Sequence, residues 1–171
     1  MDGNGPGTGE TLEKLLAAYR GYYNVWHDSE VEGFAAEAEF RLHDEQYFLV
    51  RRAKISEADS REIIFFAETE ALDEEQALAL CGRAWEEGVR RTNPGSDHMG
   101  TDISLVILAE SVSPEAARTV RSFNRTKSYR FGFWGYNRFR VVAYDLGRHA
   151  AVRNRLGDTL EKVICDIDQK S

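Results

Sequence analysis

Large apolar side chains recur at every third or fourth position near the start of the chain, at Leu12, Leu15, Tyr19, Tyr22 and Trp26. This is the period of an α-helix with one buried face, so the spacing predicts an amphipathic helix through all five positions. Thr8 is the expected N-cap, and Gly21 lies inside the helix at a modest cost in propensity. Residues 1–7 are rich in glycine and have little to bury, which predicts a flexible lead.

The pattern changes to a period of two after Gly33. Apolar residues alternate with polar ones from Phe34 to Leu42 and again from Tyr47 to Ile55, with His43-Asp44-Glu45 between the two runs. The alternation predicts two strands that each bury one face. The polar residues between them predict the turn of an antiparallel hairpin.

Three later apolar runs predict further strands, Ile63–Ala67, Ile103–Ala109 and Phe139–Tyr144. The first two are apolar on both faces, which is typical of strands in the centre of a sheet with a layer on each side.

Helix-start signals lie between these strands. Asp73 stands three residues before Gln76, as in a capping box. Ser113-Pro114-Glu115 combines an N-cap, a proline at the first helical position and an acid near the positive end of the helix dipole. A last helix is predicted over Asp158–Ile167. The apolar stripe of the helix that starts after Asp73 is Leu78, Cys81, Trp85 and Val89. That of the helix that starts after Ser113 is Ala116, Val120 and Phe123.

The predicted order of elements is therefore α-β-β-β-α-β-α-β-α. A meander of three strands followed by strand–helix–strand units predicts an α/β (mixed α+β) fold. We expect a mixed sheet of about five strands with an antiparallel meander and helices on both faces. With 171 residues the chain has the size of one domain, which we place at 8–171.

Composition narrows the class of protein further. The nine Phe, seven Tyr and three Trp argue against disorder. Two cysteines, Cys81 and Cys165, do not make a disulfide framework. No apolar run approaches the ~18 residues that a membrane span needs, and the start of the chain lacks the pattern of a signal peptide. We therefore expect a cytoplasmic protein with reduced thiols and no membrane partner.

Charge is divided unevenly along the chain. The segment from Arg118 to Arg155 holds ten of the 22 basic residues and only one of the 29 acidic residues, Asp145. Its formal charge is therefore +9, against −16 for the remainder. In its middle, from Tyr129 to Arg140, aromatic, basic and glycine residues alternate.

Eight residues of this segment are the candidate binding residues, namely Arg118, Arg121, Arg125, Arg130, Trp134, Tyr136, Arg138 and Arg140. The first three are spaced to project from one face of a helix. Three interpretations stay open. The rings pack into the core while the bases neutralise the acidic remainder, or the segment forms an interface with a second copy or an acidic protein surface. In the third, it binds single-stranded nucleic acid by stacking bases, worth about 1–3 kcal/mol each.

The third predicted strand runs into Phe66-Ala67-Glu68-Thr69-Glu70, and Asp44 precedes the second. With the order helix, three strands, helix, strand between Thr8 and Glu110, this arrangement resembles the core of the restriction-endonuclease-like superfamily, the PD-(D/E)XK nucleases. The resemblance implies a Mg²⁺-dependent nuclease in which Asp44, Glu68 and Glu70 are the candidate catalytic residues. Glu70 stands where that family has lysine, so its acid-x-Lys motif is not present.

Three carboxylates, Glu68, Glu110 and Asp145, come at the ends of apolar strands. If these ends are adjacent, their oxygens could bind a divalent cation. Acids are also common there simply because the chain reaches solvent. His98 lies between Asp97 and Asp102 in an expected loop, where a solvated histidine is the alternative to a metal or proton-transfer site. No nucleophile elbow and no phosphate-binding loop is present.

We therefore expect a non-enzymatic interaction protein that uses the basic–aromatic segment, with self-association as its first use. The alternatives are a nucleic-acid-binding protein of the same fold and a divergent Mg²⁺-dependent nuclease. No cofactor is expected apart from Mg²⁺ in the nuclease alternative.

Overall fold

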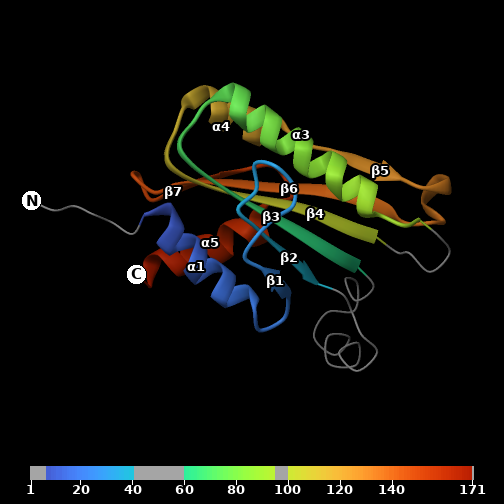
Figure 1. The fold of residues 1–171 in the computed structure, drawn as a ribbon. Helices are drawn as coiled ribbons and strands as arrows, with labels where there is room; N and C mark the ends of the chain where they lie inside the picture. Colours follow the sequence, from blue (N-terminus) through green and yellow to red (C-terminus); the bar gives the residue numbers. More distant parts are fainter. Residues whose placement is uncertain (1–6, 41–59, 95–99, 171) are drawn as a thin grey trace, which may run out of the picture.

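A mixed sheet of seven strands separates two helical layers in the computed structural model, which describes residues 7–40, 60–94 and 100–170 (Figure 1). The strands are β1 (Asn24–Trp26), β2 (Ala36–Phe40), β3 (Ser60–Leu72), β4 (Gly100–Val112), β5 (Thr126–Ser128), β6 (Tyr136–Asp145) and β7 (Ala150–Arg153). The helices are α1 (Thr8–Tyr19), α3 (Glu74–Arg91), α4 (Pro114–Ser122) and α5 (Asp158–Gln169), with a 3₁₀ turn η1 (Arg130–Gly132). The predicted class, a mixed sheet with helices on both faces, is confirmed, with more strands than expected.

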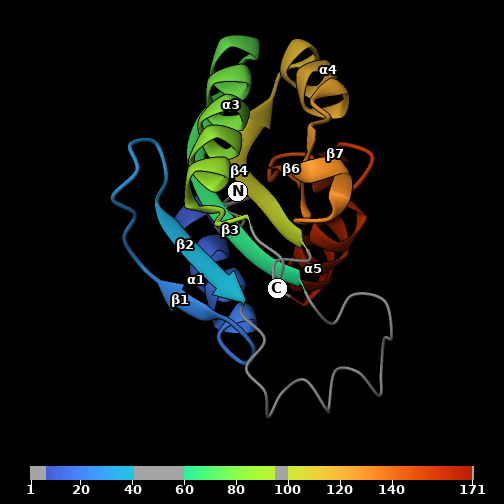
Figure 2. The same cartoon turned by 90° about the vertical axis from the view of Figure 1, so that its right-hand side faces the viewer.

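The strands follow the order β1-β2-β3-β4-β6-β5, and β7 pairs with the end of β6 beyond β5. β3, β4 and β6 run parallel because α3 and α4 carry the chain from each of them to the next. Both crossover helices cover the same face, as expected for connections of one hand that extend a sheet in one direction. α1 and α5 cover the other face (Figure 2).

Alternate residues of the central strands fill two separate cores. Ile63 and Phe65 of β3 pack beneath α3 and α4, whereas Ile64 and Phe66 pack against α1 and α5. β4 and β6 divide their side chains between the two cores in the same way. The prediction that the runs 63–67 and 103–109 are covered on both sides is confirmed.

The first helix is shorter than its hydrophobic period predicts. α1 ends at Tyr19 with Gly7 as its N-cap, so the predicted Thr8 cap and the continuation past Gly21 are wrong. Gly21 follows the C-cap, where glycine most often ends a helix. Beyond it the chain enters β1, whose pairing with β2 replaces the helical turns. Tyr22 and Trp26 consequently leave the apolar stripe and are exposed.

The helix after β3 begins where predicted but turns a different face to the sheet. Asp73 is its N-cap, and an Asp73 side-chain oxygen accepts a hydrogen bond from Gln76 N at 2.8 Å. Leu78, expected in the buried stripe, is 54% exposed. Four of the five buried positions of α3 are instead small residues, the set being Ala77, Leu80, Cys81, Ala84 and Gly88. Small side chains give a weak hydrophobic signal but let a helix lie close to a sheet.

Two glycines of α3 provide a matched test of this close packing. A Cβ on Gly88 would lie 2.5 Å from Ile103 Cγ2, whereas one on Gly82 would meet no atom within 4 Å. Gly88→Ala is therefore expected to destabilise the fold by about 1–3 kcal/mol through overpacking. Gly82→Ala should stabilise it by about 0.5–1 kcal/mol through helix propensity. Urea unfolding followed by circular dichroism measures both, and equal effects would contradict the close approach at Gly88.

The basic segment also departs from the predicted elements. Ser113 Oγ accepts from Ala116 N (3.1 Å), as expected of the N-cap of α4. The helix ends at Ser122, however, so Arg125 does not lie on a helical face with Arg118 and Arg121. β5 and β7 were not predicted, because strands of three or four residues show little hydrophobic period. The predicted strand 47–55 and its turn lie outside the described residues.

Candidate interaction surface

β5 and the start of β6 form an antiparallel hairpin that carries the basic–aromatic residues. Lys127 pairs with Asn137, and Ser128 pairs with Tyr136. The chain between these strands, residues 129–135, passes through η1 and makes the tip. At the tip Phe131 is fully exposed and Phe133 is 82% exposed. We call residues 125–136 the aromatic hairpin.

The backbone of the tip is held in an unusual conformation that turns these rings outward. Arg130 and Phe131 have φ angles of 46° and 55°, a region that bulky residues rarely occupy. Hydrogen bonds fix the turn, from Gly132 N to Tyr129 O (3.0 Å) and from Phe133 N to Arg130 O (3.0 Å). Backbone strain of this kind costs about 1–3 kcal/mol and clusters at functional sites. The tip therefore presents two phenylalanines at a cost in stability.

Cations of the aromatic hairpin lie over neighbouring rings. Arg130 lies 4.1 Å from the centre of the Trp134 ring, and Lys127 lies 5.2 Å from that of Tyr129. Arg125, just before β5, covers Phe123 at 4.4 Å. Within the ranges that the structure describes, no carboxylate lies within ion-pair distance of these three bases. The hairpin thus combines exposed aromatic surface with positive charge that has no acidic partner in those ranges.

The remaining candidate binding residues have other surroundings. Arg118 and Arg121 are exposed on α4, and Arg118 lies 3.5 Å from Glu115. Tyr136 is half-buried and packs on the start of β4, where a Cβ on Gly100 would lie 2.7 Å from Tyr136 Cζ. Arg138 lies 4.9 Å above the same ring.

Arg138 and Arg140 belong to a layer of polar side chains on the α1/α5 face of the sheet. Asp102 of β4 is their shared partner and is only 4% exposed. Its Oδ1 accepts from Arg138 Nε at 2.9 Å, and its Oδ2 lies 2.9 Å from Arg140 Nη2. Arg140 Nε is buried with no hydrogen-bond partner in the described part of the chain. These two arginines are therefore structural ion-pair partners and not free surface charges.

Glu62 of β3 completes this layer beside Asp102. One Glu62 oxygen accepts from Tyr23 Oη at 2.5 Å and the other from Ser104 Oγ at 2.9 Å. Arg140 Nη1 lies 3.8 Å away. Removal from solvent raises the pKa of Glu62, although Tyr23, Arg140 and Ser104 each act to lower it. We call Tyr23, Glu62, Asp102, Ser104, Arg138 and Arg140 the polar layer.

The register of the three parallel strands builds this layer. Glu62 is level with Asp102 on β4, and Asp102 is level with Arg138 on β6. Two residues further along these strands, Ser104 is level with Arg140. The side chains in phase with them later on each strand are apolar, such as Ile64, Val106 and Val142, and fill the core under α1 and α5. The polar layer thus occupies the start of the strands, before this core begins.

The candidate metal and catalytic acids that the structure describes lie at the opposite ends of the strands. Glu68 projects on the α1 face, near the first turn of α1. Asp145 lies on the other face, where its oxygens accept from Val112 N (3.0 Å) and Arg148 N (2.9 Å). Glu70 and Glu110 are exposed. Asp44 and His98 are outside the described residues. In the ranges that are described, no three His, Cys, Asp or Glu side chains group closely enough to hold a metal ion.

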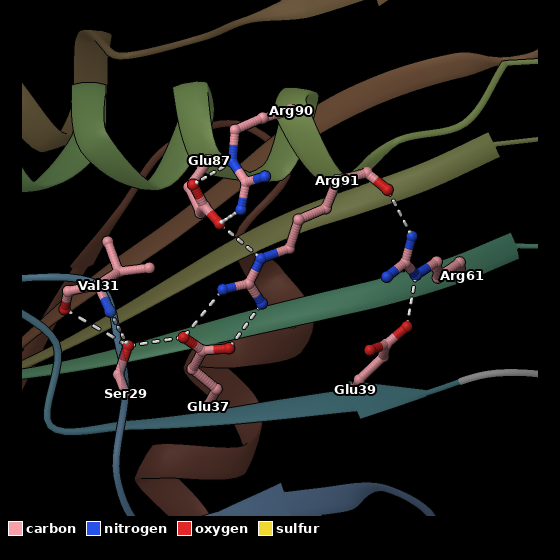
Figure 3. A network of polar contacts seen from close by, with 8 residues as sticks. All are labelled: Ser29, Val31, Glu37, Glu39, Arg61, Glu87, Arg90 and Arg91. Atoms are coloured by element: carbon pink, nitrogen blue, oxygen red, sulfur yellow. Dashed lines mark hydrogen bonds and ion pairs between the residues drawn. The ribbon is translucent and has the colours of Figure 1, made fainter.

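A second polar network lies on the α3 face and holds the connection between β1 and β2 (Figure 3). Glu37 of β2 accepts from Arg91 Nη1 at 2.6 Å and from the Ser29 hydroxyl at 2.6 Å. Ser29 Oγ also accepts from Val31 N at 3.1 Å. Arg91 is oriented in turn by Glu87, one helical turn earlier on α3. The connection is therefore tied to both the sheet and α3.

Exposed acids lie on this anchored connection, and exposed rings lie just before it, at Tyr22 and at the end of β1. Tyr22 and Trp26 are 77% and 48% exposed. Asp28, Glu30 and Glu32 are exposed as well, and the segment 22–33 contains no Lys or Arg. We call residues 22–33 the acidic edge. It includes β1, at the opposite end of the strand order from the aromatic hairpin.

The chain matches the family described as Domain of unknown function (DUF8052) over residues 8–165. The chain belongs to this family. No curated protein and no solved structure matches it. The match spans the residues of the acidic edge, the polar layer and the aromatic hairpin. None of the helices that the structure describes is long and apolar enough to cross a membrane.

Most residues of the polar layer were not predicted from the sequence. Asp102 was expected in a loop, and Tyr23, Glu62 and Ser104 were not singled out. Glu62, Ser104 and Arg140 each stand two positions before an apolar residue of the same strand, for example Glu62 before Ile64. Polar residues in phase with a buried face were the available signal, since buried polar groups need partners. Finding the partners requires the strand register.

Proposed function

We propose that this chain is a non-enzymatic interaction protein that associates with a second copy of itself through the aromatic hairpin. The observation that carries the proposal is the exposure of Phe131 and Phe133 on a turn whose φ angles are strained. Burying such rings against a partner is favourable, because each buries about 150–250 Å² of surface. A turn that already holds them outward reduces the entropy lost on binding.

The surroundings of the two rings support an interface. In the same hairpin Arg130 lies over the Trp134 ring and Lys127 over the Tyr129 ring. Arg with aromatic residues is the combination enriched at binding hot spots. The bases of the hairpin favour a partner surface that is acidic, because opposite charges speed association and select the partner.

Single-stranded nucleic acid is the second candidate partner. Exposed rings beside arginine are the stacking platforms of such sites. Two observations favour a protein partner instead. Arg138 and Arg140, which would extend the positive surface, are paired with Asp102. The chain as a whole carries a net charge of −7, which opposes binding to phosphate.

The double variant Phe131→Ser/Phe133→Ser tests the proposal. Wild-type protein is expected to self-associate in sedimentation velocity at ~100 μM or below, and the variant to associate at least tenfold more weakly, about 1.4 kcal/mol or more. Leu78→Ser is the matched control, because Leu78 is an exposed apolar side chain on α3 outside the hairpin. That variant should behave as wild type.

Two results would count against self-association through the hairpin. One is a wild-type protein that stays monomeric at ~100 μM. The other is equal weakening by Leu78→Ser. Titration with a mixed single-stranded oligonucleotide distinguishes the second candidate. Salt-sensitive binding by monomeric wild type that is lost in the Phe variant would make nucleic acid the partner.

A further inference from the structure

We propose that the aromatic hairpin of one copy binds the acidic edge of another, so that the chain associates head to tail. This inference rests on the proposed function and names the surface that the hairpin meets. It follows from the charge, the exposed rings and the positions of the two segments.

The two segments are complementary in charge. The aromatic hairpin contains three bases, Arg125, Lys127 and Arg130, and no acid. The acidic edge contains three acids, Asp28, Glu30 and Glu32, and no Lys or Arg. A symmetric contact between two hairpins would bring together two surfaces of formal charge +3. Contact between a hairpin and an edge pairs +3 with −3, which favours the head-to-tail arrangement.

Both segments also expose aromatic side chains. Phe131 and Phe133 of the hairpin can pack against Tyr22 and Trp26 of the edge, and all four are among the most exposed large apolar residues that the structure describes. Such ring pairs contribute about 0.5–1.5 kcal/mol beyond the area they bury. Charge would select the partner surface, and the rings would provide most of the affinity.

The acidic edge is held in place before any partner arrives. Ser29 is bound to Glu37, which Arg91 of α3 fixes from the other side (Figure 3). Arg83 Nη1 donates to Glu32 O at 2.8 Å, and at Gly33 (φ 94°) a Cβ would lie 2.5 Å from that nitrogen. Like the strained hairpin tip, the edge is preorganised, so ordering it on binding costs little.

The positions of the two segments determine what kind of assembly follows. β1 and β5 are the two ends of the strand order, and in Figure 2 β1 and β6 lie at opposite sides of the sheet. One copy therefore has the two surfaces at different edges and can use both at once. A contact between unlike surfaces leaves one hairpin and one edge free after each step, so assembly continues into a ring or a filament.

Two variants that each disable one surface test the arrangement. Phe131→Ser/Phe133→Ser removes the hairpin rings, and Asp28→Lys/Glu30→Lys reverses charge on the edge. Each variant alone should be monomeric in sedimentation velocity. In an equimolar mixture, the intact edge of the first should bind the intact hairpin of the second, giving a dimer that grows no further.

A charge-matched control distinguishes the effect of changing the acidic edge from the effect of changing the net charge of the protein. Glu86→Lys/Asp166→Lys changes two exposed acids on α3 and α5 by the same total charge and should self-associate like wild type. If Asp28→Lys/Glu30→Lys still self-associates and the mixture gives no mixed dimer, the head-to-tail inference is overturned while the hairpin proposal stands. If the hairpin variant still self-associates, the proposed function itself fails.

Discussion

Asp102→Ala is expected to destabilise the fold by about 3–5 kcal/mol, the effect of removing one partner from a buried ion pair. Asp102 is 4% exposed, accepts hydrogen bonds from Arg138 and forms an ion pair with Arg140. Without it, the Arg140 guanidinium would depend on Glu62, whose carboxylate lies 3.8 Å away. Arg140 would be affected most, because its Nε already has no partner within the described residues. Chemical denaturation followed by circular dichroism measures the change.

Two further variants make that measurement specific. Asp102→Asn keeps the size and one acceptor but removes the charge, so its loss of stability should be intermediate. Glu13→Ala removes an acid that lies 3.5 Å from His27 on the surface, where such pairs contribute at most about 1 kcal/mol. A loss below about 1 kcal/mol for Asp102→Ala would mean that the two arginines reach solvent instead of depending on Asp102.

The polar layer lies next to the base of the aromatic hairpin. Arg138 is level with Thr126 of β5, and the adjacent Asn137 donates through Nδ2 to Tyr129 Oη at 2.9 Å. The residues that pair the hairpin onto the sheet therefore neighbour those that Asp102 fixes. We infer that a substitution that disrupts the polar layer would also weaken the pairing of β5 with β6 at the base of the hairpin.

Much of the fold followed from hydrophobic period and capping signals. The doubly apolar runs 63–67 and 103–109 became the central strands β3 and β4. Asp73 caps α3, which joins these two strands, and Ser113 caps α4, which follows β4. These elements were predictable because the signals are local. α1 was predicted too long, since the choice between another helical turn and pairing of β1 with β2 depends on residues more than ten positions away.

The candidate site was predictable only in part for the same reason. Exposure of Phe131 and Phe133 depends on the turn conformation at Arg130, which composition does not reveal. Arg138 and Arg140 look like surface charges in the sequence, because Asp102 lies 36 and 38 positions away and becomes their neighbour only through parallel strand pairing. The +9 charge of the segment overstates its free positive surface, because Arg138, Arg140 and Arg153 are paired with acids within the fold.

Glu62→Gln is expected to stabilise the protein increasingly as the pH rises from about 4, near the ordinary pKa of glutamate. Burial raises the pKa of Glu62 in the folded protein, so the folded state binds its proton more tightly than the unfolded chain does. The resulting stability is fully present below the unfolded pKa and is lost as the pH rises through the folded one. Glutamine stays neutral throughout and avoids that loss.

The other groups facing Glu62 do not disturb the comparison. Burial also raises the pKa of Tyr19 and Tyr23, which keeps both phenols neutral across this range. Arg140 and Asp102 are common to both proteins. Each unit by which the folded pKa exceeds the unfolded one corresponds to about 1.4 kcal/mol.

Unfolding free energies measured from about pH 4 to 9 should therefore give a difference between Glu62→Gln and wild type that grows and then levels off. Glu30→Gln, an exposed carboxylate on the acidic edge, is the control, because its surroundings are aqueous in both states and its curve should run parallel to wild type. A difference that shrinks with rising pH would mean that hydrogen bonds from Tyr23 and Ser104, with the Arg140 charge, outweigh the burial of Glu62. The polar layer would then favour a charged Glu62, whereas burial alone favours the neutral carboxyl group.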